Sequence, residues 1–180
     1  SCTKIVPILA VSCSPNSVSL DWLRAKTKSS YYCIRVVSNF IVMSDREAFL
    51  SILIVAVACD GRIRNDEAAG LRKVLENRRL FASVSEREMS ELTLKISNEI
   101  SSQGFPVVLD CAISSLSICY HDSVVAVATY LVGLDRCLKS DEQNFLDYLG
   151  THPGFQCSLD PNLIIKSMLA FNEDKMKELS

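Results

Sequence analysis

From Ser44 onward, apolar residues recur every three or four positions, which is the period of amphipathic helices. The first apolar stripe, within residues 45–59, consists of Phe49, Ile52, Leu53, Ala56 and Val57. Further helices are expected over 66–79, from Ser85 to Gly104, over 106–120, over 123–134, from Ser140 to Gly150 and over 161–172. No strand-like alternation of useful length appears in this part of the chain. The pattern therefore predicts an all-α fold of about seven helices.

Polar residues mark the starts of three of these helices. Ser44 with Glu47, and Ser85 with Glu88, have the spacing of a capping box. In such a box the serine oxygen accepts the amide three residues on, and the carboxylate accepts the amide of the serine. A third box is expected where Ser140 precedes Gln143.

The chain also contains an internal repeat with an offset of 75 residues. Residues 60–67 lie over residues 135–142, and both segments read Asp-x-x-(Ile/Leu)-(Arg/Lys)-(Asn/Ser)-Asp-Glu. An apolar helix precedes each copy and an amphipathic helix follows it. A repeat of this kind indicates a duplicated structural unit. We therefore expect two pseudo-symmetric helix-loop-helix hairpins packed as a bundle.

Each repeated turn carries carboxylates at equivalent positions, namely Asp60 and Glu67, and Asp135 and Glu142. Helix capping explains most of each turn, but an aspartate at a helix C-terminus faces the negative end of the helix dipole and needs a counter-charge. A neighbouring basic residue or a metal ion could supply it. Oxygen ligands suit Ca²⁺, Mg²⁺ or Mn²⁺. Two interpretations stay open: a cation site formed by these four residues, or helix caps and solvated acids.

The first turn and its approach resemble the tellurite-resistance TerB family and the related TerB-like domain at the start of the membrane-anchored co-chaperone DjlA. The residues that carry the resemblance are 56–63 (AVACDGRI) with Asp66 and Glu67, and the second acidic turn at 135–142. The resemblance covers roughly residues 44–172. A departure is Arg136, which stands where the first copy has Gly61 and could neutralise a cation site.

This resemblance implies an all-helical, non-enzymatic domain in the bacterial cytoplasm, or peripheral to the inner membrane, that acts in tellurite or other stress resistance. It also implies that the acidic turns bind a divalent cation, and that the partners are other proteins, including membrane-associated stress-resistance components. The alternative is a metal-free helical interaction module of the co-chaperone kind. A thiol-dependent enzyme that reduces tellurite ranks third.

Composition narrows the classes of partner. Of 180 residues, 48% are hydrophobic, with only 6 Gly and 5 Pro, which favours one domain of long helices. Residues 43–180 hold 14 basic and 20 acidic residues, whereas residues 1–42 hold five basic and one acidic. An acidic body argues against nucleic acid, because phosphate binding needs clustered Lys and Arg. The longest apolar stretch, residues 48–59, is too short to insert into a bilayer.

The first 42 residues are basic, rich in Ser and poorly periodic. Met43 directly precedes the first capping box, so we hypothesise that the native protein starts there and that residues 1–42 are a non-native or dispensable extension. The alternative is an ordinary N-terminal extension with short helices near 18–28 and 31–42. The domain boundaries are then 1–42 for the extension and 43–180 for the helical domain.

Eight cysteines and two histidines form no zinc-binding spacing, and no Cys-x-x-Cys pair occurs. Cys111 and Cys119 fall in apolar helical runs, so we expect them to be buried as small hydrophobic residues in a reducing compartment. His121 stands at a helix break, where capping or a surface position is expected. No catalytic motif is present, which favours a protein that is not an enzyme.

Overall fold

The computed structural model describes residues 42–59, 65–135, 139–161 and 163–164, with the side chains of 65–67 and 135 left out. Within these ranges every regular element is a helix, so the all-α prediction is confirmed there. The elements in chain order are α2 (Asp45–Ala58), α3 (Asn65–Glu76), α4 (Glu86–Gln103), α5 (Phe105–Ser115), η1 (Ile118–Tyr120), α6 (His121–Val132), η2 (Gly133–Asp135) and α7 (Ser140–Thr151).

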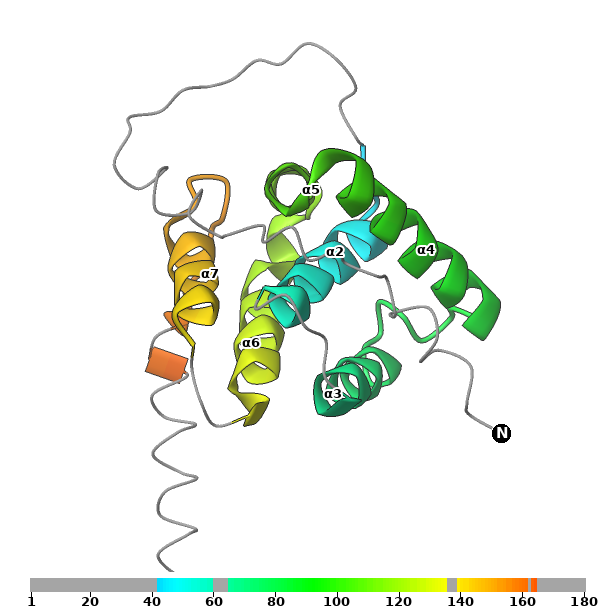
Figure 1. Ribbon diagram of the computed structural model, residues 1–180, viewed down its shortest axis with the longest axis horizontal. Coiled ribbons are helices and arrows are strands. Elements are labelled where there is room, and N and C mark those ends of the chain that lie inside the picture. The colour runs from blue at the N-terminus through cyan, green and yellow to red at the C-terminus, as the bar shows by residue number, and fades with distance from the viewer. Residues whose placement is uncertain (1–41, 60–64, 136–138, 162, 165–180) are drawn as a thin grey trace, which may run out of the picture.

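Helix α2 is the centre of the molecule, and α3, α4, α5 and α6 all pack against it (Figure 1). Every residue from Ala48 to Ala58 is buried, including Ser51. The sequence pattern predicts one inward face for this helix, whereas the structure surrounds it on all sides. A helix that is apolar all round is stable only when it is enclosed in this way.

The two sequence-predicted hairpins correspond to α2 with α3 and to α6 with α7. Their first helices, α2 and α6, pack directly against each other, and α7 packs on α6. The turns that join the helices of each hairpin, 60–64 and 136–138, lie outside the described residues. The expected two-fold relation between the hairpins therefore stays a prediction.

The predicted helix over 106–120 is wrong in its last five residues. Helix α5 ends at Ser115, Leu116 is extended, and the short η1 leads into α6. The Asp45 carboxylate explains the break, since it accepts the backbone amide of Ser117 at 2.8 Å and the Ser117 hydroxyl at 3.0 Å. A tertiary hydrogen bond from the start of α2 thus holds Ser117 out of the helix.

The first two predicted capping boxes are confirmed, and the third is displaced by one residue. Ser44 and Glu47 cap α2, and Ser85 and Glu88 cap α4, each with both reciprocal hydrogen bonds. Helix α7 instead begins at Ser140, so the residue that precedes it is Lys139. The carboxylate that accepts the Lys139 amide, at 2.8 Å, belongs to Glu142 and not to Gln143.

A single glycine turns the chain between α4 and α5. Gly104 has φ +84° and its amide donates to the Ile100 carbonyl at 2.8 Å, which closes the end of α4. Because L-residues rarely adopt this conformation, glycine is required here. Of the predicted helix over 161–172, only Pro161, Leu163 and Ile164 are described as helical.

In the described part of the chain, no single helix has both the length and the apolar character needed to cross a bilayer. Only the pair Phe105–Ser115 and Ile118–Val132 meets those criteria together, and the two are bent by 110° at the break between them.

Candidate functional site

The four acidic residues expected to form a cation site are described to different extents. Asp60 lies outside the described residues. Glu67 belongs to the first turn of α3, and Asp135 is the last residue of η2, but their side chains are not described. Glu142 is described fully. Within the described residues, no group of three or more His, Cys, Asp or Glu side chains could hold a metal ion.

Glu142 serves as the cap of α7. The residue is only 2% exposed. One of its carboxylate oxygens accepts a hydrogen bond from the Lys139 amide at 2.8 Å. The other oxygen lies 3.9 Å from the Lys139 ammonium group. A metal ion would have to compete with both of these interactions. Glu142 therefore fits a structural role better than a metal-ligating one.

The elements that carry Glu67 and Asp135 are nevertheless neighbours. Helix α3 packs against both α6 and η2. A Cβ atom on Gly70 would lie 2.6 Å from Cδ1 of Leu134 and 3.4 Å from Cδ2 of Leu131, so the glycine allows this close approach. Since Leu134 directly precedes Asp135, the structure brings α3 of the first hairpin next to the turn of the second.

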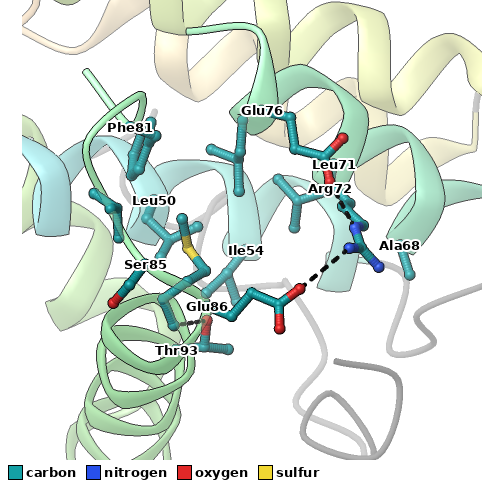
Figure 2. A pocket seen from close by; sticks show the side chains of 13 residues that line it. Leu50, Ile54, Ala68, Leu71, Arg72, Glu76, Phe81, Ser85, Glu86 and Thr93 are labelled. Carbon is teal, nitrogen blue, oxygen red and sulfur yellow. Dashed lines mark hydrogen bonds and ion pairs between the residues drawn. The ribbon is translucent and has the colours of Figure 1, made fainter. Parts of the chain in front are cut away.

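A cavity opens between α2, α3 and α4 (Figure 2). Leu50 and Ile54 of α2, almost fully buried, lie at its base. Leu71 and Leu75 come from α3, and Met89 and Thr93 come from α4. The remaining lining residues are Ala68, Arg72, Glu76, Phe81, Val84, Ser85 and Glu86.

This cavity has a volume of about 140 Å³ and a mainly apolar lining. A closed apolar cavity of roughly 150 Å³ accepts a benzene-sized ring in another protein, so a Leu, Met or Phe side chain is of suitable size here. Phe81 of the lining packs edge-to-face on Phe49 of the core, with ring centroids 6.0 Å apart. Met89 is a flexible side chain that can adapt to an occupant.

Charged groups line only the mouth of the cavity. Arg72 of α3 pairs with Glu76, with Nε 2.8 Å from Oε1, and its Nη2 lies 4.0 Å from Oε1 of Glu86 on α4 (Figure 2). The site thus combines an apolar interior with a polar rim. Such an arrangement is typical of a binding site.

The sequence pattern did not predict this cavity. It placed Phe49, Ile52, Leu53, Ala56 and Val57 inward, whereas the base of the cavity is formed by Leu50 and Ile54 from another face of α2. The signal that could have indicated it is the unbroken apolar run of residues 52–58, because a helix without a polar face must contact neighbours on every side.

His121 is buried, which corrects the expectation of a capping or surface position. It is 2% exposed, its Nε2 lies 3.1 Å from the Leu116 carbonyl oxygen, and its Nδ1 accepts the Gln156 amide at 3.0 Å. The ring stacks on Phe155 with centroids 4.4 Å apart. These contacts assign the hydrogen to Nε2. His121 thereby joins α6 to the end of α5 and to the loop after α7.

The next residue, Asp122, binds the same loop. Its carboxylate accepts the amide of Ser158 at 2.8 Å, the hydroxyl of Ser158 at 2.8 Å and the thiol of Cys157 at 2.9 Å. The hydrogen bonds from Cys157 and Ser158 lower the pKa of Asp122 to about 2. Burial, with the same bond to Asp122, raises the pKa of Cys157 to about 11, so this thiol is a poor nucleophile at neutral pH.

A third polar group ties α7 to α5. The Tyr148 hydroxyl donates to the Asp110 carboxylate, and His152 Nε2 lies 3.7 Å from the same carboxylate. Burial, and then the bond to Asp110, raise the pKa of Tyr148.

Cys119 is exposed and Cys111 is half-buried, so the predicted burial of both thiols in the core is wrong for Cys119.

Comparison with protein-family models, with curated proteins and with solved structures gave no match for this chain. The resemblance to the TerB family therefore stays a prediction.

Proposed function

We propose that this chain is a helical protein-interaction module that binds an apolar side chain of a partner protein in the cavity between α2, α3 and α4. The observation that carries the proposal is the cavity of about 140 Å³ with its apolar lining and polar mouth. Burying one Leu- or Phe-sized side chain there contributes about 1.5–3 kcal/mol to binding. This corresponds to the metal-free alternative raised from the sequence, and it requires no catalytic residue.

Two neighbouring alanines on α3 allow a matched test. Ala68 lines the cavity, whereas Ala69 is exposed and does not. We would measure binding of a leucine-rich amphipathic helical peptide by fluorescence anisotropy to the wild type, Ala68→Phe and Ala69→Phe. Ala68→Phe fills the cavity and should abolish binding, whereas Ala69→Phe should leave binding unchanged. Circular dichroism checks that both variants are folded. A wild type that does not bind, or two variants that bind equally, would refute the proposal.

A second candidate function is the TerB-like one, a stress-response domain that binds a divalent cation and acts in tellurite or other oxyanion resistance. The observation that favours it is the packing of α3 against η2, which places Glu67 and Asp135 on adjacent elements. The engagement of Glu142 as a helix cap narrows the proposed ligands to Asp60, Glu67 and Asp135.

Calorimetric titration distinguishes this candidate. Ca²⁺, Mg²⁺ and Mn²⁺ are each titrated into the wild type and into the double variant Asp60→Asn/Asp135→Asn. Heat from the wild type alone supports a cation site, because amides are weaker ligands than carboxylates for these cations. The absence of heat from both proteins rules it out and leaves the interaction module.

A further inference from the structure

The mouth of the α2/α3/α4 cavity carries two carboxylates and one guanidinium group. Glu76 and Glu86 approach Arg72 from different helices (Figure 2). Their side chains are 60% and 78% exposed, whereas that of Arg72 is 30% exposed. Among the charged side chains that line the described cavity, negative charge therefore exceeds positive charge by one. The two carboxylates are also the more accessible groups.

The composition of the chain beyond residue 42 is acidic as well. Residues 43–180 contain 14 basic and 20 acidic residues. Arg72 pairs with both carboxylates, but its single positive charge balances only one of their two negative charges. A partner that brings its own cation would complete the charge balance at the mouth, and one that brings another carboxylate would be repelled.

We infer that the partner segment is a basic amphipathic helix from another protein, with a bulky apolar side chain in the cavity and a Lys or Arg one turn away that pairs with Glu76 or Glu86. This inference rests on the proposed function. Residues three or four apart lie side by side on a helix, so one face of the partner can present both groups. The apolar contact provides most of the affinity, and the exposed charges provide selectivity and salt dependence.

The test uses the full chain and two peptides with the same leucine-rich face. One peptide carries lysines on its remaining positions, and its twin carries glutamates. At low ionic strength the lysine peptide should bind about ten-fold more tightly than the glutamate peptide. Raising the salt concentration should reduce this difference, because the contacts at the mouth are exposed to solvent.

Variants then locate the effect. Glu76→Gln/Glu86→Gln should weaken binding of the lysine peptide by about five-fold and remove the preference over its twin. Asp147→Asn is the control, because it removes an exposed carboxylate on α7, which lies on the other side of α2 from α4 (Figure 1). That control should leave both affinities unchanged. Ala68→Phe should abolish binding of both peptides.

The outcomes separate the two proposals. Equal binding of both peptides, abolished by Ala68→Phe, would overturn the basic preference and leave the cavity as a binding site. Failure of both peptides to bind the wild type would overturn the proposed function itself. Sedimentation velocity supplies a further check: a dimer that dissociates in Ala68→Phe would show that the occupant is a second copy of this chain, which also overturns the inference.

Discussion

At the scale of single residues, His121 and Asp122 show how the loop after α7 is held. His121 contacts two separate segments, the end of α5 and the loop after α7, through its two ring nitrogens and its stacked face. Asp122 binds Ser158 and Cys157 from the solvent side. Adjacent residues at the start of α6 thus fix one loop from the inside and from the outside.

Replacing His121 with Ala should lower the free energy of unfolding by about 2–4 kcal/mol. The substitution leaves the Leu116 carbonyl, which is buried, and the Gln156 amide, which is partly buried, without their partner, and it removes the stacking on Phe155. Urea denaturation followed by circular dichroism measures the change. Tyr130→Ala, an exposed position on the same helix, is the control. A loss below about 1 kcal/mol for His121→Ala would contradict this role.

Asp122 should make the folded state sensitive to acid. Because the folded-state pKa of Asp122 is about 2, below the ordinary value of 3.8, its hydrogen bonds stabilise the protein above about pH 4. This stabilisation is lost as the pH falls from about 4 towards 2. Urea denaturation across this range should show a smaller pH dependence for Asp122→Asn than for the wild type. Identical pH profiles would show that these hydrogen bonds do not form in solution.

At the scale of elements, reciprocal caps mark where α2 and α4 begin. The boxes at Ser44 and Ser85 involve residues close in sequence, so the sequence predicted them correctly. The pKa of Glu47 and that of Glu88 are both lowered, and the serine hydrogen bonds are among the causes. For Glu47 the largest single cause is burial, which acts in the opposite direction and raises the pKa. The α7 cap differs, because Lys139 cannot accept a hydrogen bond and only the Glu142 carboxylate contributes.

Glu142→Ala should therefore destabilise the protein by about 1–3 kcal/mol, because the partly buried Lys139 amide loses its acceptor. Asp141→Ala changes the adjacent first-turn acid and should cost about 0.3–1 kcal/mol. Thermal unfolding with and without Ca²⁺ measures both. A structural cap predicts the same loss in either condition. A loss that appears only with Ca²⁺ would instead assign Glu142 to a cation site.

At the scale of the whole molecule, α2 organises the fold, since four other helices pack on it (Figure 1). The close approach of α3 to the end of α6 depends on Gly70, which faces Leu131 and Leu134. The same packing brings the first hairpin next to the turn of the second. It also helps to set where α3 lies relative to α4, and so the width of the cavity between them.

Gly70 should tolerate Ala but not Ile. In Gly70→Ala the gain in helix propensity, about 1 kcal/mol, offsets the shift required of the flexible Leu134 side chain. Gly70→Ile should lower the free energy of unfolding by about 1–3 kcal/mol, because the larger side chain forces α3 away from α6. Gly70→Ile/Leu134→Ala should recover part of this loss. Chemical denaturation of the three variants measures the effect, and equal stability of Gly70→Ile and wild type would contradict the packing.

Local patterns in the sequence determined the helical class, most helix bounds and the caps at Ser44 and Ser85, because these depend on hydrogen bonds and apolar spacing within a few residues. Contacts between distant segments decided the rest. Asp45 ends α5 by binding Ser117, His121 is buried by residues 35 positions further on, and Leu50 meets Leu71 and Met89 at the cavity. No short-range period carries such information, since the free energy of these contacts exists only once the helices have packed together.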